Sequence, residues 1–313
     1  MTDLLSRIKF LSWMCTRGQL IHLRYRRTKG ERSRVGNILP SEQTLDYILT
    51  HKCSVARFGD GEFQMIEHGL KGGDASSFGV DTFQTFDPAL AGRLREVLLD
   101  PQENLLVCVP YPMIRSSVYR GYERVYFERE WLGRPGPIRE AVVRHPVLGD
   151  STFTRFYMHR TDIHDYTGYV AAIKRLWDGL PVILVEGEKS RLGVGNDLFN
   201  NVANLKRIIC PSVNAFAAYD RILSGIEKHG RPDALYLLAL GHTATVLAAD
   251  LAAKGLRAID IGHVDIEYEW MRMKARRKCP VKYKYVNEVP TGREVAGHIS
   301  DGQYEKEILL RIS

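Results

Sequence analysis

The chain has 313 residues, of which 44% are hydrophobic and 26% charged, values typical of a globular protein with a sizeable core. No apolar run reaches eighteen residues, and residues 10–14 are too few and wrongly flanked for a secretory signal, so we expect a cytoplasmic protein without a membrane span. The net charge of +7 is concentrated at residues 24–29 and 272–284, which indicates an anionic partner or a solvated basic face.

Residues 1–40 are interpreted as a basic leader, and residues 1–34 are expected to form an amphipathic helix. Its apolar positions precede the arginine run and comprise Leu4, Leu5, Ile8, Leu11 and Trp13. Such a helix can lie on an anionic membrane or pack against the domain. The five cysteines are scattered without metal-binding spacing, and we expect them to be reduced and mostly buried.

After Pro40 the chain alternates between predicted helices and strands. Ser41 is a plausible N-cap, with Glu42 in the first turn. The predicted helices cover residues 41–51, 88–99, 113–131, 170–177, 197–202, 214–228 and 243–254. The predicted strands cover residues 54–58, 105–109, 181–185, 207–209, 234–240 and 258–261. This alternation predicts a doubly wound, Rossmann-like α/β fold, with a mainly parallel sheet covered by helices on both faces. Ligands of such sheets bind beyond the carboxyl ends of the strands.

The first loop after a predicted strand has the sequence Arg57-Phe58-Gly59-Asp60-Gly61-Glu62. Two acids two residues apart can reach one hard cation, and the glycines let the backbone approach a phosphate. The same pattern also fits a surface turn in which Asp60 supports the bend and Glu62 caps the next helix. Local chemistry leaves both interpretations open.

The second loop runs from Glu186 to Asp197 and contains Gly187, Glu188, Gly193, Gly195 and Asn196. Its glycines would let backbone amides point at phosphate oxygens, and Arg191 would add a bidentate clamp. The motif lacks the third glycine of a dinucleotide fingerprint and the Lys-Ser/Thr pair of a P-loop. Its position after a strand is what indicates a phosphate site.

The third loop places Gly241, His242 and Thr243 between a strand and a helix. Free amides at a helix N-terminus bind anions, although Thr243 also fits a simple N-cap and His242 a structural hydrogen bond. The fourth loop carries His263, Asp265 and Glu267 at alternate positions, so an extended segment would present all three on one side. That cluster fits a metal site or a general base, or else an exposed edge strand. The adjacent Tyr268 and Trp270 suggest a platform for a flat ligand.

Taken in order, these four loops resemble the GT-D-type glycosyltransferase family, first catalogued as a bacterial domain of unknown function. The resemblance covers about residues 41–288, including the run Lys284-Tyr285-Val286-Asn287-Glu288, and defines a domain over 41–290 with a tail over 291–313. One departure is His242, where a smaller or more rigid residue such as proline is expected.

The resemblance implies transfer of a sugar, a hexose such as glucose, from a nucleotide diphosphate donor such as a UDP-sugar to a hydroxyl of a growing cell-surface or glycoprotein glycan. Asp60 and Glu62 match the Asp-x-Glu motif and would serve a divalent metal, Mn²⁺ or Mg²⁺, and the donor diphosphate. His263, Asp265 and Glu267 are the candidates for the general base, with Glu188 a weaker one. The expected donor contacts are Arg57, Gly59, Gly187, Glu188, Arg191, Gly193, Gly195, Asn196, Gly241, His242 and Thr243.

Two other functions fit parts of this pattern. A metal-dependent phosphohydrolase or nucleotidyl enzyme would use the same acids and phosphate loops with water as the nucleophile. A non-catalytic polyanion-binding protein would use the basic patches, but acidic loops repel phosphates unless a metal intervenes, so nucleic acid is not the expected partner. The expected acceptor is a glycan or glycoprotein, lipid-linked if the basic leader holds the protein at the inner membrane face.

Overall fold

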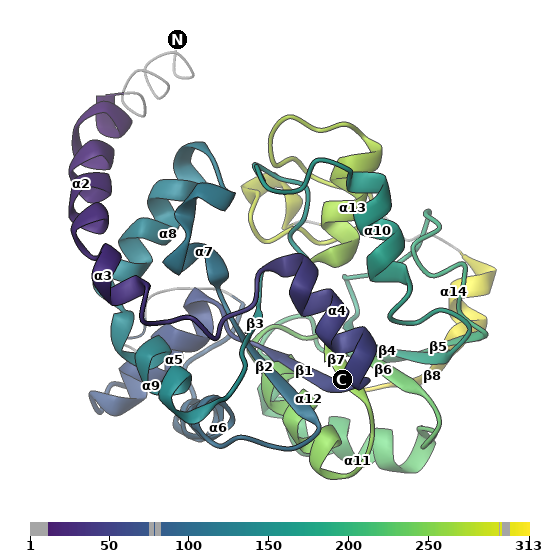
Figure 1. Ribbon diagram of the computed structural model, residues 1–313. Coiled ribbons are helices and arrows are strands. Elements are labelled where there is room, and N and C mark those ends of the chain that lie inside the picture. The colour runs from purple at the N-terminus through teal and green to yellow at the C-terminus, as the bar shows by residue number, and fades with distance from the viewer. Residues whose placement is uncertain (1–11, 75–77, 79–82, 294, 296–300) are drawn as a thin grey trace.

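The computed structural model of the protein describes residues 12–74, 78, 83–293, 295 and 301–313. Within these residues eight strands form one sheet in the order β3-β2-β1-β7-β6-β4-β5-β8, and every pairing is parallel. The strands are β1 (Ser54–Arg57), β2 (Leu105–Val109), β3 (Gly149–Asp150), β4 (Pro181–Gly187), β5 (Asn204–Cys210), β6 (Leu235–Ala239), β7 (Ala258–Asp260) and β8 (Ile308–Arg311). Figure 1 shows the helices arranged around this sheet. The predicted α/β fold class is confirmed.

The α-helices before the fourth strand are α2 (Gln19–Arg27), α3 (Lys29–Arg32), α4 (Ser41–His51), α5 (Asp60–Leu70), α6 (Pro88–Leu99), α7 (Tyr111–Ile114), α8 (Gly121–Gly133), α9 (Pro135–Arg144) and α10 (Tyr166–Lys174). The later ones are α11 (Tyr219–His229), α12 (His242–Ala253), α13 (Val264–Arg272) and α14 (Gly302–Glu307). Sequence determines several of these boundaries directly. At the start of α6, for example, the Asp87 carboxylate accepts hydrogen bonds from the amides of Ala89 and Leu90, and Pro88 occupies the first turn.

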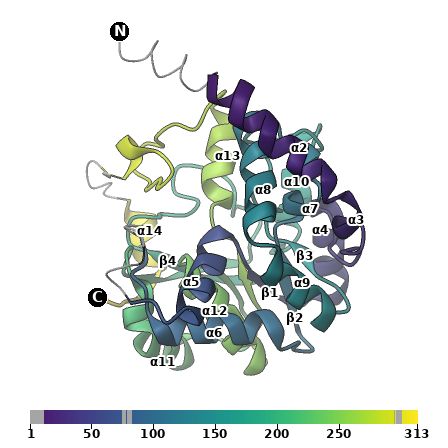
Figure 2. The same ribbon diagram turned by 90° about the vertical axis from the view of Figure 1, so that its left-hand side faces the viewer.

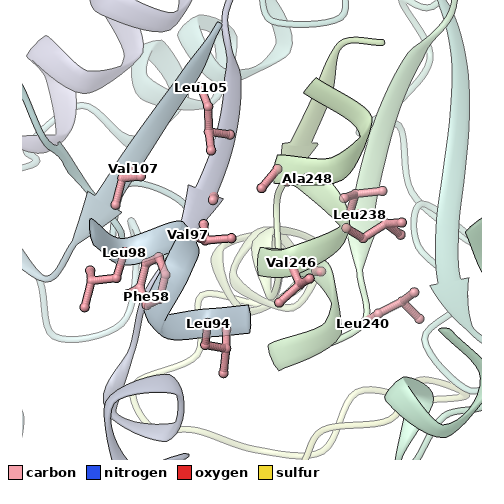
Figure 3. Close-up of a cluster of buried hydrophobic side chains, with 14 of the residues drawn as sticks. Phe58, Leu94, Val97, Leu98, Leu105, Val107, Leu238, Leu240, Val246 and Ala248 are labelled. Atoms are coloured by element: carbon pink, nitrogen blue, oxygen red, sulfur yellow. The ribbon is translucent and has the colours of Figure 1, made fainter. Parts of the chain in front are cut away.

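Helices cover both faces of the sheet because successive strand residues point to opposite sides. On one face, alternate strand residues such as Val107 and Leu238 pack against α5, α6, α11 and α12. Figure 3 shows part of this layer, where Leu94 and Leu98 of α6 and Val246 of α12 lie beside the strand side chains. On the other face, the intervening strand residues pack against α4, α10 and α13. A doubly covered sheet leaves its carboxyl edge as the open place for a site.

Most predicted elements are found, and α4, α6 and β2 begin and end at the predicted residues. Two helix predictions are wrong. The helix predicted for 113–131 is interrupted after Ile114 by a 3₁₀ turn, and α8 starts at Gly121, whose φ of +64° suits a residue without a side chain. Residues 197–202 form turns, because the Asn196 side chain accepts from the Leu198 amide and the Lys174 ammonium binds the Asp197 carbonyl.

The basic leader packs on the domain in its described part. Residues 1–11, which include Leu4, Leu5, Ile8 and Leu11, lie outside the described residues. Met14–Gly18 form a π-helical turn that continues into α2, and α2 lies along α8 (Figure 2). His22 forms a hydrogen bond of 2.8 Å with Glu128, and the Trp131 indole donates to Thr28 at 3.1 Å. Among the described helices, none is both long and apolar enough to cross a membrane.

Candidate functional site

A cavity of about 490 Å³ lies at the carboxyl edge of the sheet, beyond β1, β6 and β7. Its other walls include α8, the start of α13, residues between 151 and 158, and the segment between residues 278 and 288. The predicted site residues that line it are Arg57, Gly59, Asp60, Glu62, Gly241, His242, His263 and Glu267. The first, third and fourth loops therefore meet at one site, as their positions after parallel strands predict.

Asp60 and Glu62 lie in the first turn of α5 and line this cavity. The Glu62 carboxylate accepts a hydrogen bond of 2.7 Å from the amide of Gly59, which completes the helix cap. Asp60 is exposed toward the cavity, and its carboxylate accepts a hydrogen bond from the hydroxyl of Tyr126. Burial and the nearby Asp60 charge raise the pKa of Tyr126, so this hydroxyl remains a donor. The two interpretations of this loop are compatible, because Glu62 caps the helix and still faces the cavity.

His242 is the first residue of α12 and is 8% exposed. In the described structure neither of its imidazole nitrogens has a hydrogen-bond partner, and the buried Thr243 hydroxyl also has none. The ring lies against Gly61, where an added Cβ would be 2.5 Å from Nε2. A glycine between the two acids is therefore required by the packing of His242. Unpaired polar atoms at the N-terminus of a long helix leave this end of the cavity able to bind an anion.

Arg57 is held inside the protein and also lines the cavity. Its guanidinium donates to Asp260 at 2.7 Å and to Thr154 at 2.7 Å. Burial raises the pKa of Asp260, and the Arg57 charge counters this effect. The pair connects β1 to β7 at the cavity wall.

The extended segment predicted for residues 263–267 is wrong, because α13 begins at Val264 and His263 is its N-cap residue. Residues two apart in a helix are separated by about 200° around the helix axis, so Asp265 and Glu267 lie on different sides of α13. Asp265 is fully buried outside the cavity, where it accepts from the Gly193 amide at 3.0 Å and pairs with Lys284 at 2.6 Å. Its interactions are those of a structural anchor.

Glu267 and His263 both line the cavity, but they differ in how many of their polar atoms already have a hydrogen-bond partner. Glu267 Oε2 accepts from the amides of Tyr157 and Met158, both at 2.9 Å, and burial raises the pKa of this carboxyl. His263 has both nitrogens engaged, with Asn287 at 2.9 Å and Arg155 at 3.3 Å. Burial and the Arg155 charge lower the pKa of His263 to about 4, which keeps its imidazole neutral. Glu267 is therefore better suited than His263 to accept a proton.

The glycine-rich second loop is used mainly inside the fold. Apart from Ser190 and Leu192 it does not reach the cavity, and its bend is held because Asp265 accepts from both Gly193 and the Asn196 side chain. Arg191 donates to the Tyr283 carbonyl at 3.1 Å and lies beside a second, smaller cavity of about 240 Å³. The structure thus separates Gly187, Glu188, Arg191, Gly193, Gly195 and Asn196 from the cavity that contains Asp60.

The aromatic platform predicted at residues 268–270 is not found. Trp270 is fully buried and its indole donates to the Cys279 carbonyl, while the Tyr268 hydroxyl donates to Asp197. The aromatic side chains at the cavity instead come from other segments, namely Phe58, Phe83, Tyr119, Tyr122, Tyr126, Phe127 and Tyr285. The density of Tyr and Arg in residues 113–131 was the available sequence signal for four of them.

Sequence reasoning also missed an ion-pair network at the cavity wall. Arg155 pairs with Glu288, and Lys278 lies 3.0 Å from Glu288 and 3.6 Å from Glu123. Although burial opposes it, the Arg155 and Lys278 charges hold the pKa of Glu288 below its usual range. Glu288 belongs to the run that carries the family resemblance, which was the only signal for it.

The acids fit a metal ion only as part of a complex with a phosphate ligand. In the described part of the chain, no group of three or more His, Cys, Asp or Glu side chains is arranged to hold a metal. Mg²⁺ is commonly bound through one or two carboxylates together with substrate phosphates and water. Asp60 and Glu62, next to the unpaired atoms of His242, match that pattern.

The parallel sheet, with a cavity lined by acids and a helix N-terminus at its carboxyl edge, defines a doubly wound α/β protein. Residues 55–289 match the model of the glycosyltransferase GT-D fold, and the chain belongs to this glycosyltransferase family.

Two curated relatives of this chain are also named as glycosyltransferases. The chain is 34% identical over 283 residues to a probable glycosyl transferase Gly of Streptococcus gordonii and 32% identical over 275 residues to the glycosyltransferase GlyD of Streptococcus pneumoniae serotype 4. These matches cover 88% and 87% of this chain but only 39% and 32% of the relatives. The chain thus spans about a third of the length of these proteins.

Two solved structures superpose on this chain over nearly their whole length. A domain of unknown function 1792, described as having a distinct glycosyltransferase fold, superposes with a TM-score of 0.77 at 35% identity, covering 91% of this chain and 99% of that one. A glycosyltransferase of the same domain family from Streptococcus sanguinis gives 0.73 at 34% identity, with 88% and 99% covered.

Proposed function

We propose that this glycosyltransferase moves a hexose such as glucose from a UDP-sugar to a hydroxyl of a glycan, with the cavity at the carboxyl edge as the donor site. The observation that supports this most is the meeting of Asp60, Glu62 and the unpaired atoms of His242 in one cavity. A cation would let these carboxylates and the α12 N-terminus bind one phosphate ligand together, because it offsets the repulsion between carboxylate and phosphate. A nucleotide diphosphate with a divalent metal fits this arrangement.

Asp60 and Glu62 would hold Mn²⁺ or Mg²⁺, which when bound supplies positive charge to the leaving diphosphate. The α12 N-terminus and the His242 imidazole would bind the diphosphate oxygens through N–H groups. Tyr126 would orient Asp60 through its hydroxyl. Glu62 is already bonded to the Gly59 amide and His242 is already buried before the donor binds, so little reorganisation of these two groups is expected as charge develops.

Glu267 is the proposed general base for the acceptor hydroxyl. Two backbone amides fix its Oε2, and its raised pKa increases its affinity for the proton it would receive. The aromatic side chains of α8, including Tyr122 and Tyr126, line the same cavity and suit the flat faces of sugar rings. Asp265 is not proposed as the base, because Lys284 and the Gly193 amide occupy its oxygens.

The experiment is a turnover assay with UDP-glucose and a panel of para-nitrophenyl glycosides as acceptors, with Mn²⁺, with Mg²⁺ and with chelator. We expect acceptor-dependent UDP release that chelator abolishes. Glu267→Gln should lower kcat about 10²-fold or more while UDP binding persists, since only proton transfer is lost. Glu188→Gln is the matched control, because Glu188 is exposed and lies outside both cavities.

Two results would contradict this proposal. UDP release at the same rate without any acceptor would identify a hydrolase. Full turnover by Glu267→Gln would remove Glu267 as the base.

A further inference from the structure

We propose that the outer face of α2 binds an anionic membrane surface. The inner face of this helix is committed to the domain, since Tyr25 is buried and His22 bonds Glu128 of α8. Figures 1 and 2 show α2 on the outside of the molecule, alongside α8. The opposite face of the helix therefore points to solvent.

That outer face carries two large apolar side chains one turn apart. Leu20 is 50% exposed and Leu23 is 53% exposed, although the domain contains a large core. At 100° per residue, Leu20, Leu23 and Arg27 fall within one narrow sector, with Arg24 and Arg26 on its two sides. An apolar centre with cationic flanks is the pattern of helices that lie in a membrane interface.

The charge of this region is almost entirely positive. Between residues 12 and 34 the only acid is Glu31, and it pairs with Arg139. In the described structure, no carboxylate pairs with the exposed cations Arg17, Arg24, Arg26, Arg27, Lys29 and Arg34. Unpaired cations beside exposed leucines fit anionic headgroups above acyl chains.

The exposed leucines favour lipid over nucleic acid. Phosphate binding alone needs no apolar contact, so Leu20 and Leu23 would remain exposed on a duplex. In a bilayer interface the leucines would enter the acyl region while the arginine side chains extend to the phosphates.

The helix also has a direct relation to the catalytic cavity. It packs on α8, and α8 supplies Tyr122 and Tyr126 to the cavity wall. The ring of Trp13, just before α2, lies 5.9 Å from the ring of Tyr122. If the proposed function is correct, docking through α2 would hold the cavity close to acceptors carried on lipid.

The test is co-sedimentation of the full chain with vesicles of phosphatidylcholine alone and with added phosphatidylglycerol, without donor or metal. We expect at least tenfold stronger binding to the anionic vesicles, and weaker binding at high salt. Arg24→Gln with Arg27→Gln, and separately Leu20→Ser with Leu23→Ser, should each reduce binding at least tenfold. The control is Arg221→Gln with Lys228→Gln, which removes the same charge from the exposed side of α11, far from α2 in Figure 1.

Absence of vesicle binding, or equal binding by all three double variants, would overturn the proposal. Tighter binding of a DNA duplex that the leucine substitutions do not change would assign the basic face to nucleic acid instead. Thermal melting of each variant checks that the fold is retained. Because no donor is present, a negative result would leave the donor site proposal intact.

Discussion

Asp60 and Glu62 make different contacts, although they are only two residues apart. Glu62 accepts from the Gly59 amide and so contributes to the start of α5, whereas Asp60 is exposed to the cavity and interacts with the Tyr126 hydroxyl. Replacing each carboxylate by the corresponding amide removes its charge while nearly preserving the shape of the side chain. The amide of a glutamine can still accept from Gly59, so the helix cap survives the loss of charge.

For Asp60→Asn and Glu62→Gln we expect metal-dependent turnover to fall about 10²-fold or more, because each removes a charge near the leaving diphosphate. The unfolding free energy should change by only about 0.5 kcal/mol, as is usual for surface substitutions. Urea unfolding and UDP release from UDP-glucose measure the two effects. Retained turnover in both variants would mean that the loop is a turn and no more.

Gly61 and His242 form a close contact that a side chain would disrupt. In Gly61→Ala the new Cβ would be 2.5 Å from His242 Nε2, so the imidazole must move. We expect Gly61→Ala to weaken UDP binding. In a protein that already carries His242→Ala, we expect Gly61→Ala to cause no further loss of UDP affinity. A double-mutant cycle of UDP affinity measures this coupling. Additive losses would show that the two residues act independently.

His263 makes stability depend on pH in a defined direction. Its pKa in the folded protein is lowered to about 4, whereas an unfolded histidine titrates near 6.5. Between these values the unfolded chain holds a proton that the folded chain does not, so stability falls as the pH decreases from about 6.5 toward 4. The slope from this residue is at most about 1.4 kcal/mol per pH unit. His263→Gln should flatten the profile measured by urea unfolding, and an unchanged slope would contradict this assignment.

At the scale of elements, α13 connects the fourth loop to the second. Asp265 accepts from the Gly193 amide and the Asn196 side chain, and Asn196 also donates to Glu269 at 2.7 Å. The bend of the glycine-rich loop thus depends on a helix some seventy residues later in the chain. Lys284 secures the arrangement from a third segment.

Asp265→Ala should lower the unfolding free energy by about 3–5 kcal/mol, because it leaves the Lys284 charge buried without its nearest partner. Denaturant unfolding measures the loss. Asp265→Leu combined with Lys284→Met should be more stable than Asp265→Ala, since no unpaired charge remains. A fully stable Asp265→Ala protein without turnover would instead make Asp265 a catalytic residue.

For the whole molecule, six of the eight strands were predicted from the sequence, because buried strands and amphipathic helices follow local patterns. The two edge strands were not predicted, and β8 lies in the segment expected to be a tail outside the domain. The sequence also placed Asp60 and Glu62 at the carboxyl edge, since the parallel-sheet rule needs only strand positions. It grouped Arg191 with the same donor contacts, whereas the structure places Arg191 beside the second cavity, because Asp265 holds the intervening loop and that contact has no local signature. The aromatic side chains that α8 contributes to the cavity were missed for a similar reason, since α8 reaches the cavity only after the chain turns at Gly121.

The relatives and solved structures support the family over most of the chain. The curated relatives are longer and contain much that this chain does not match.

The most direct test compares UDP affinity with Mn²⁺ in Asp60→Asn and Arg191→Gln by calorimetry. These residues were both predicted donor contacts, and the structure places them at different cavities. We expect Asp60→Asn to weaken UDP binding at least tenfold and Arg191→Gln to leave it within twofold of the unmodified protein. Loss of binding in Arg191→Gln with none in Asp60→Asn would move the donor site to the glycine-rich loop and contradict the assignment.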